Sequence, residues 1–354
     1  VDLGKVQHNA RTLVDRLAPL GVGVTAVSKA TLGSVEVATA VLAGGAHRLG
    51  ESRIENVERL RAAGVVAPIL LVRSPMLSQV DRVVTSADAS CNTEVEIVAA
   101  LSEAALAQGR RHGVVLMVEL GDLREGILAE DLERVVKEVL RLPAIHLRGI
   151  GANLACQNGV VPDDRNMARL SALAGSVEVA FGLHLVEVSG GSSANLDWAL
   201  GGGAIGRVDD LRLGESILLG REPLHRTPIE GLHTDAFTLV GEVIEAKVKP
   251  SQPWGSFAQT AFGPAVDTAG SRSAEHGEGP RAIVALGHQD TDPWGLTPPP
   301  GIEVLGASSD HLVLATGAAL LALGSEVRFQ LTYGALVRAT TSSAVPVWHG
   351  GGTR

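Results

Sequence analysis

The sequence has few of the residues that characterise disulfide-rich, membrane-embedded or nucleic-acid-binding proteins. It contains only two cysteines, Cys91 and Cys156, which cannot form a disulfide framework and favour a reducing, cytoplasmic environment. No apolar run reaches the roughly 20 residues needed to span a bilayer. The net charge of −9, spread without long acidic blocks, argues against nucleic acid or an anionic membrane as the main partner. We therefore predict a cytoplasmic protein whose partner is a small molecule.

Tyrosine and the other aromatic residues are scarce as well. Aromatic side chains account for 3% of the sequence, and Tyr333 is its sole tyrosine. A reaction that uses two different tyrosine positions of this chain is therefore excluded. The remaining composition, 45% hydrophobic and 19% charged, is ordinary for a globular protein.

The first 225 residues alternate between short apolar runs and longer amphipathic stretches. A helix-like stretch over about 5–19 precedes apolar runs at 21–27, 46–49, 68–72, 87–91, 114–120, 145–151, 183–189 and 210–214. Continuous apolar strands that alternate with helices indicate a parallel sheet buried on both faces. Eight such units predict an α/β fold with a (β/α)8 barrel of the TIM type. A doubly wound open sheet is the alternative, but the number of units and the lack of a glycine-rich fingerprint after the first strand favour the barrel.

The pattern changes near Thr227. Period-two stretches at 237–249, 303–315 and 325–341 are separated by proline- and glycine-rich connections. They predict a C-terminal, mostly-β domain over 226–354 after a barrel domain over 1–225. The polar, glycine-rich segment from about 264 to 280 is expected to form a loop.

Several polar residues directly follow predicted barrel strands, where the catalytic groups of such barrels lie. Lys29 follows the first strand in VSKATLG. Asp122 and Arg124 follow the fifth strand in GDLREG, and Asn153 and Cys156 follow the sixth in GANLACQNG.

Lys29 is the most unusual of these residues, because burying an ammonium group is costly. Desolvation lowers the pKa of a lysine and frees its amine to form a Schiff base with a carbonyl compound. The alternative is that Lys29 lies in solvent just past the strand and has no chemical role.

Two serine- and glycine-rich turns follow the seventh and eighth strands. SGGSSANL contains Ser192 and Ser193, and DLRLGESILLG contains Arg212, Gly214 and Glu215. Glycines let backbone N–H groups approach an anion, and serines donate further hydrogen bonds. Barrels often bind phosphate at this place. The alternative is that these residues only form ordinary turns. A Schiff-base lysine combined with a phosphate site is what pyridoxal 5′-phosphate (PLP) requires.

Longer strings of the sequence resemble one family of PLP enzymes. VDLGKVQHNARTL, VSKA, LRLGESILLG and LTYGALVRATTSSAVPV are similar to motifs of the alanine racemase-like, fold-type III enzymes. SGGSSANL, GANLACQNG, GASSDHLVL and DAFTLVGEVIEAKVKPSQPWG resemble the ornithine racemase-like branch. The resemblance covers nearly the whole chain. It implies an amino-acid racemase that interconverts D and L forms, with ornithine or another basic amino acid as substrate, and a homodimer with shared active sites.

The resemblance also implies a role for each matching position. Lys29 would carry PLP and act as one proton-transfer base, and Arg212 would bond to the pyridine nitrogen. Arg124 matches an arginine that binds the substrate carboxylate, and Asp310 matches an acidic residue contributed across the dimer interface. The other cofactor contacts implied by the family are at Asn153, Ser192, Ser193, Gly214, Glu215 and Tyr333.

Two departures from alanine racemases concern the proton transfers. Asn153 stands where those enzymes stack a histidine on the cofactor ring, and no tyrosine stands where they have their second base. Racemisation by two bases needs a proton donor on each face of the substrate. His311 and Cys156 are the candidates. His311 as an ordinary polar residue and Cys156 as a small apolar side chain are the alternatives.

Two other activities remain open at this stage. The first is a PLP-dependent lyase acting on D-amino acids, whose relatives pair a metal-binding histidine at the place of His311 with a metal ligand two residues later. Val313 stands there and cannot bind a metal, so we predict no metal. The second is a non-catalytic PLP-binding protein, against which the β domain counts. A basic substrate further calls for an acidic residue near its distal ammonium, and Asp122, Glu215 and Asp310 are the candidates.

Overall fold

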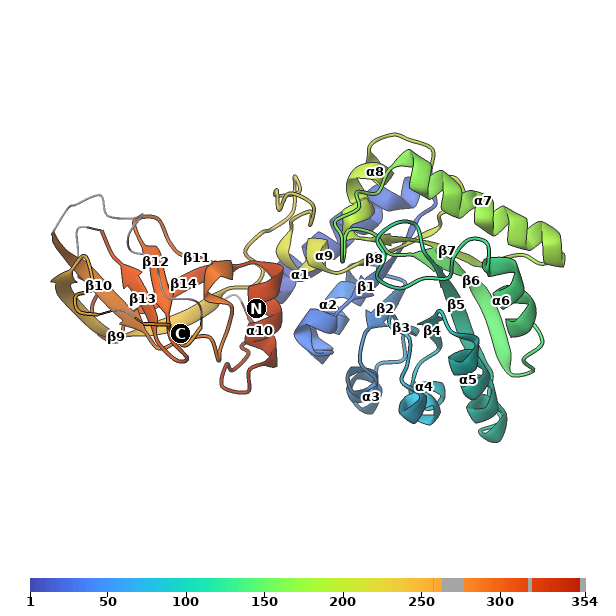
Figure 1. Cartoon of the computed structure of the whole chain (residues 1–354), viewed down its shortest axis with the longest axis horizontal. Coiled ribbons are helices and arrows are strands. Elements are labelled where there is room, and N and C mark those ends of the chain that lie inside the picture. The colour runs from blue at the N-terminus through green and yellow to red at the C-terminus, as the bar shows by residue number, and fades with distance from the viewer. Residues whose placement is uncertain (257, 263–276, 318–319, 351–354) are drawn as a thin grey trace. The chain divides into compact units, whose positions relative to one another are not determined.

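The computed structural model divides into two compact units, each built around its own sheet (Figure 1). The structure describes residues 1–256, 258–262, 277–317 and 320–350. The barrel unit spans Asp2–Ala236, and the second unit spans Phe237–Trp348.

The barrel unit is a closed ring of eight parallel strands in sequence order, so that β1 pairs with both β2 and β8. Its strands are β1 (Gly23–Val27), β2 (Arg48–Glu51), β3 (Ile69–Leu71), β4 (Ala89–Asn92), β5 (His112–Val118), β6 (Ile145–Ala152), β7 (Glu187–Ser192) and β8 (Asp210–Leu213). Its helices are α1 (Leu3–Leu17), α2 (Val35–Ala43), α3 (Ile54–Ala62), α4 (Val80–Ser86), α5 (Val95–Ala107), α6 (Leu132–Val139), α7 (Asp164–Phe181), α8 (Leu196–Leu200) and α9 (Glu215–Leu219). The predicted (β/α)8 barrel is confirmed.

Local sequence explains these elements. Every residue of β5 is buried, as expected for a strand covered by helices on one side and by the barrel interior on the other. The Asp2 side chain caps α1 by accepting from the Lys5 backbone N–H at 3.1 Å. Asp163 and Asn166 form a reciprocal capping box at the start of α7.

One half of the barrel interior is charged. Arg48 on β2 donates to Glu187 on β7 through both terminal nitrogens, with 2.7 Å for the Nη1–Oε2 pair, and to Asp210 on β8 at 3.2 Å. Because β2 and β7 are not neighbours in the ring, this ion pair crosses the inside of the barrel. Thr25 and Ser189 also donate to Asp210, at 2.6 and 2.7 Å. Arg48, Glu187 and Asp210 are at most 4% exposed, so water contributes little to their stabilisation.

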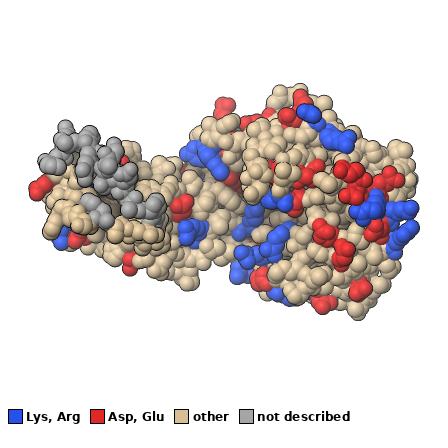
Figure 2. All heavy atoms as spheres, in the orientation of Figure 1, with Lys and Arg blue, Asp and Glu red and all other residues tan. Residues whose placement is uncertain are grey.

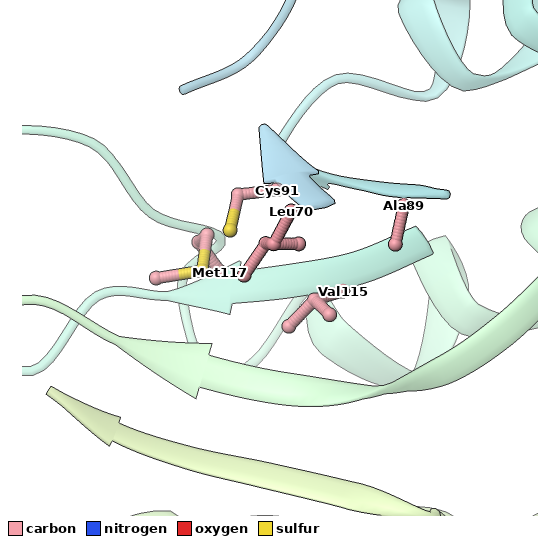
Figure 3. Close-up of a cluster of buried hydrophobic side chains, with 5 residues drawn as sticks. All are labelled: Leu70, Ala89, Cys91, Val115 and Met117. Atoms are coloured by element: carbon pink, nitrogen blue, oxygen red, sulfur yellow. The ribbon is translucent and has the colours of Figure 1, made fainter. Parts of the chain in front are cut away.

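The other half of the interior is apolar. Figure 3 shows side chains from β3, β4 and β5 meeting in one cluster, namely Leu70, Ala89, Cys91, Val115 and Met117. Burial raises the pKa of the Cys91 thiol to about 11, and the charges of Arg212, Glu187, Arg48 and Asp210 also act on it. Cys91 therefore lies where the apolar half meets the charged half.

The second unit contains a six-stranded sheet in the order β11-β14-β9-β10-β13-β12. Its elements are β9 (Leu239–Pro250), β10 (Glu278–Val284), β11 (Leu296–Thr297), β12 (Glu303–Ala307), β13 (Leu312–Ala315), β14 (Glu326–Leu331) and α10 (Tyr333–Thr341). All pairings among these strands are antiparallel. The predicted mostly-β character of this region is confirmed.

Two details of the second unit differ from the sequence prediction. The period-two stretch predicted over 325–341 is a strand only up to Leu331, because the Thr332 side chain caps a helix and the helical spacing of Ala335, Leu336 and Ala339 buries one face. The loop predicted over 264–280 is wrong at its end, since β10 begins at Glu278 and pairs with β9. The part over 264–276 lies outside the described residues.

The segment after α9 stays with the barrel unit. Asn9 on α1 donates to the His233 carbonyl at 2.8 Å, and Lys5 on α1 pairs with Asp235 at 2.6 Å. These contacts place the division between the units after Ala236, later than the predicted boundary after residue 225. They join positions more than 200 residues apart, so the local pattern could not reveal them.

Charged side chains of both signs are interspersed over the face of the barrel unit seen in Figure 2. Within the described part of the chain, no helix combines the length and apolarity that crossing a lipid bilayer requires.

The charged interior gives a stability prediction. Replacing Arg48 with Ala leaves the buried Asp210 without an arginine partner and Glu187 with only Arg148, whose Nε lies 3.4 Å from Oε2. We expect a loss of about 3–5 kcal/mol in the free energy of unfolding. Urea denaturation followed by circular dichroism measures it. Arg134→Ala is the matched control, because Arg134 makes its ion pairs with its side chain 59% exposed, and its loss should stay below about 1 kcal/mol. A smaller loss for Arg48→Ala than for Arg134→Ala would contradict the role given to the interior ion pairs.

Candidate active site

Lys29 lies directly beyond β1, in a short 3-10 turn over Lys29–Thr31. The residue is exposed to solvent, yet protein surrounds its amine closely enough that desolvation lowers its pKa. Arg124 and Arg212 lower this pKa further, whereas Cys156 and Glu51 act to raise it. An accessible lysine with a lowered pKa is suited to covalent chemistry with a carbonyl group.

Arg212 on β8 is fixed by hydrogen bonds on both of its terminal nitrogens. Nη2 donates to Asn153 Oδ1 at 2.7 Å and to the Ala152 carbonyl, and Nη1 donates to Ser189 Oγ. Ser189 in turn donates to Asp210. Hydrogen bonds therefore connect Arg212, which is 5% exposed, to the charged residues of the barrel interior.

Arg124 and Asn153 meet at the carboxylate of Glu125, which the sequence pattern does not mark as a site residue. Glu125 Oε1 accepts from Arg124 Nη2 at 2.6 Å and from Asn153 Nδ2 at 2.6 Å. Because Asn153 also accepts from Arg212, a continuous chain of hydrogen bonds joins the two arginines. The edge of Arg124 formed by Nε and Nη2 is engaged by Glu125 in this state.

Ser193 is the centre of a small cluster of donors at the ends of β7 and β8. Its Oγ accepts from the backbone N–H groups of Gly214 and Ser216, both at 3.2 Å, and lies 2.9 Å from Ser216 Oγ. Ser192 caps the adjacent short turn by accepting from the Ala194 N–H. Gly191 in the same turn has φ +139°, and a Cβ there would lie 2.0 Å from Asn195 Oδ1, so the turn requires glycine.

These residues fit PLP. Strands β7, β8 and β1 are neighbours in the ring, so the Ser193 cluster, Arg212 and Lys29 lie at adjacent strand ends of the same barrel rim. Hydroxyl and backbone N–H donors suit a phosphate group, a buried guanidinium suits an unprotonated ring nitrogen, and an accessible amine suits the aldehyde.

Asp122 organises the loop that carries Cys156. Its carboxylate accepts from four backbone N–H groups, those of Cys156, Gln157, Asn158 and Val160, at 2.9–3.4 Å. Although burial acts to raise it, these hydrogen bonds hold the pKa of Asp122 below its usual value. Ala155 adopts a left-handed φ of +59°, which a non-glycine residue holds only when its surroundings impose it. The loop therefore presents the exposed Cys156 in a defined conformation.

Two of the carboxylates considered as partners of a distal ammonium are already engaged. Asp122 is 1% exposed and saturated by the loop N–H groups. Glu215 is paired with Arg226. Neither carboxylate is therefore available to a substrate in this conformation.

Three predicted site residues lie in the second unit. Tyr333 is the first residue of α10, and Asp310 and His311 lie in the turn before β13, where His311 Nδ1 is 2.8 Å from Asp310 Oδ1. The hydrogen bond with His311 lowers the pKa of Asp310. Their assignment to the active site stays a prediction.

The structure adds Glu51 to the surroundings of Lys29. Glu51 ends β2, is fully buried and acts on the charge of Lys29. Its place at the end of a strand, in GESRIEN, is the signal that could have identified it.

The chain is similar over nearly its whole length to known racemases. Residues 1–222 match the family model described as alanine racemase, N-terminal domain. The ornithine racemase of Acetoanaerobium sticklandii is 37% identical over 352 residues, which cover 98% of this chain and 97% of that protein. The lysine racemase of Thermotoga maritima is 35% identical over 348 residues, which cover 98% of this chain and 96% of that protein.

Solved structures share the fold at lower identity. Alanine racemase from Streptomyces coelicolor superposes with a TM-score of 0.74 at 19% identity, covering 99% of this chain and 97% of that one. D-threonine aldolase from Filomicrobium marinum gives a TM-score of 0.72 at 17% identity, covering 96% of this chain and 87% of that one. The same fold thus serves both a racemase and a lyase.

The Asp122 carboxylate gives a prediction for the loop over 156–160. In Asp122→Ala the backbone N–H groups of this loop lose their acceptor, and we expect their hydrogen exchange to accelerate at least about tenfold. Because the pKa of Asp122 is lowered by folding, the wild-type protection should persist at neutral pH and be lost only as the pH falls below the usual pKa of an aspartate. Asp131→Ala, which removes an exposed carboxylate of an ion pair with Arg134, is the control. Unchanged exchange of the loop in Asp122→Ala would show that the loop is held by other contacts.

Proposed function

The chain belongs to the alanine racemase N-terminal domain family and is an amino-acid racemase, and we propose that it uses PLP on Lys29 to racemise a basic amino acid of the ornithine or lysine type. The observation that carries the PLP assignment is the arrangement of an accessible amine with a lowered pKa, a buried guanidinium and a cluster of anion donors on three neighbouring strand ends.

Each residue of this arrangement has a distinct task in the proposal. When bound, PLP withdraws electrons from the α carbon of the amino acid, so that the α hydrogen can leave as a proton. Arg212 would hold the ring nitrogen and, because arginine stays protonated, would keep that nitrogen unprotonated. Ser193 and the backbone of Gly214 and Glu215 would hold the phosphate, with Ser192 shaping the turn. Asn153 would lie beside the ring.

The substrate carboxylate is assigned to Arg124. This guanidinium must exchange or share the partner that it has in the structure, because Glu125 occupies its Nε and Nη2 edge. A carboxylate that replaces another carboxylate costs little electrostatically, so the pairing with Glu125 keeps Arg124 oriented until the substrate arrives.

Proton transfer is assigned to Lys29 on one face of the substrate and to Cys156 on the other. A proton removed from one face and returned to the opposite face inverts the α carbon. Cys156 is the stronger of the two candidates because its thiol is exposed and lies near enough to Lys29 and Arg124 to interact electrostatically with both. His311 is the second candidate, and its hydrogen bond with Asp310 is what favours it.

The basic side chain of the substrate is supported by the names of the two full-length relatives, ornithine racemase and lysine racemase. Asp122 is saturated by the loop and Glu215 is paired with Arg226. Asp310 is hydrogen-bonded to His311, but 64% of its side chain is exposed, so Asp310 is the proposed partner of the distal ammonium. This assignment belongs with a homodimer in which Asp310, His311 and Tyr333 complete a site. Both cysteines are free, which supports a cytoplasmic enzyme.

Lys29→Ala tests the attachment of the cofactor. The purified wild-type protein mixed with PLP should develop a visible absorbance band. Borohydride should abolish this band by reducing the Schiff base, which leaves PLP covalently attached to Lys29. The variant should show no such band. Polarimetry on the same samples should show loss of rotation of L-ornithine or L-lysine with the wild type alone. A borohydride-reducible band of wild-type strength in Lys29→Ala would exclude the assignment, and a band without loss of rotation would favour a lyase or a carrier.

Cys156→Ala tests the second proton-transfer group, with His311→Ala as its matched counterpart. Removing a base that serves one face slows exchange of the α hydrogen for solvent deuterium from one enantiomer more than from the other. We expect a decrease of about 10²–10⁴-fold for one enantiomer in Cys156→Ala and none in His311→Ala. Equal slowing for both enantiomers in Cys156→Ala would remove Cys156 from this role, and a one-sided effect in His311→Ala would give the role to His311.

A further inference from the structure

Glu51 is a buried carboxylate that the proposed mechanism does not use. It ends β2 and is 0% exposed. Ser28 Oγ donates to its Oε1 at 2.6 Å, Asn56 Nδ2 donates to its Oε2 at 2.9 Å, and the backbone N–H of Ser52 also donates to the carboxylate. Burial nevertheless raises its pKa above the usual value. Keeping a carboxylate in such a place is costly, so a specific function for Glu51 is expected.

The donor Ser28 is the residue that immediately precedes Lys29. Its backbone N–H donates to the Gly50 carbonyl on β2 at 3.1 Å, so Ser28 is bonded to β2 by both its backbone and its side chain. Its carbonyl accepts from the backbone N–H and the hydroxyl of Thr31, each at 2.9 Å, which closes the turn around Lys29. The conformation of the lysine-bearing turn therefore depends on Ser28, and Ser28 depends on Glu51.

Four charged or titratable groups act on the Lys29 amine, and each comes from a different strand end. Arg212 on β8 and Arg124 after β5 disfavour the ammonium form, while Cys156 after β6 and Glu51 on β2 favour it. Cys156 lies on an exposed loop, whereas Glu51 is shielded from solvent and fixed by three donors. Among the described residues no ion pair includes Glu51, so its charge is not neutralised by an arginine as that of Glu187 is by Arg48.

We propose that Glu51 is a positioning residue for Lys29, which holds the lysine-bearing turn through Ser28 and supplies the negative charge that stabilises the Lys29 ammonium against Arg124 and Arg212. The carboxylate keeps this lysine able to hold a proton in a cationic site. A residue that returns protons to a substrate needs that ability. The inference concerns the lysine used in the proposed function, but it can be tested without cofactor or substrate.

The experiment measures how readily Lys29 reacts as a free amine at different pH values. The full-length chain, with any bound PLP removed, is labelled briefly with an amine-selective acylating reagent, and each lysine is quantified by peptide mass. The sequence has only four other lysines, Lys5, Lys137, Lys247 and Lys249, and the exposed Lys137 on α6 serves as the internal control. In Glu51→Gln we expect the pH midpoint of Lys29 labelling to fall by about one pH unit. Below the midpoint, this shift corresponds to about ten times more neutral Lys29 amine than in the wild type at the same pH. The labelling of Lys137 should not change.

Ser28→Ala separates the charge from the hydrogen bond. This variant keeps the carboxylate and should shift the midpoint much less than Glu51→Gln. An unchanged midpoint in Glu51→Gln overturns the proposal, and an equal shift in Ser28→Ala overturns the assignment of the effect to charge. If circular dichroism shows that Glu51→Gln does not fold, Glu51→Asp replaces it. This variant keeps the carboxylate, so its midpoint for Lys29 labelling should stay near that of the wild type. A difference of a full pH unit would count against the proposal. None of these outcomes depends on whether the protein racemises an amino acid.

Discussion

The ion pair between Arg48 and Glu187 is the contact on which the architecture of the site rests. It crosses the barrel interior between strands that are not neighbours. Arg48 also donates to Asp210, Asp210 accepts from Ser189, and Ser189 accepts from Arg212. In a medium with little water, each of these charges is stabilised only by its partners. On the side of the barrel interior, Arg212 is held by Ser189 and the charged groups bonded to it. On the side of the rim, it is held by Asn153 and the Ala152 carbonyl.

The site built on this base has two kinds of positioning. Arg212 and Ser193 lie on or beside strands and are held by short-range hydrogen bonds within the barrel. Arg124 and Cys156 lie on loops. Glu125 orients the Arg124 side chain, and Asp122 accepts from the Cys156 backbone N–H, so both carboxylates come from the segment that follows β5. Lys29 combines both kinds, since its turn is anchored to the neighbouring strand by Ser28. Carboxylates thus organise a site whose main functional groups are cationic.

The fold could be predicted because its signals are local, and the residues proposed for the cofactor carry local signals as well. Eight apolar runs gave the barrel, and Lys29 and the serine turns stand next to strands that can be recognised alone. Glu51, Glu125 and Asp210 could not be assigned, because their roles arise from partners on other strands. The apolar residues of the stretch over 333–341 fit period two as well as a helix, and only the Thr332 cap and tertiary burial decide between them. The position of Asp122 after a strand makes it one of three candidates for the partner of a distal ammonium, whereas in the structure its carboxylate accepts from four backbone N–H groups of the loop over 156–160.

The balanced charges of the barrel interior also constrain how such a sequence can change over time. Two arginines, Arg48 and Arg212, share an enclosed space with two carboxylates, Glu187 and Asp210. A single neutral replacement leaves one charge without a counterpart, so substitutions that survive must come in compensating pairs. Homologous sequences should therefore show these positions varying together, with the sum of their charges conserved even where the individual residues are not.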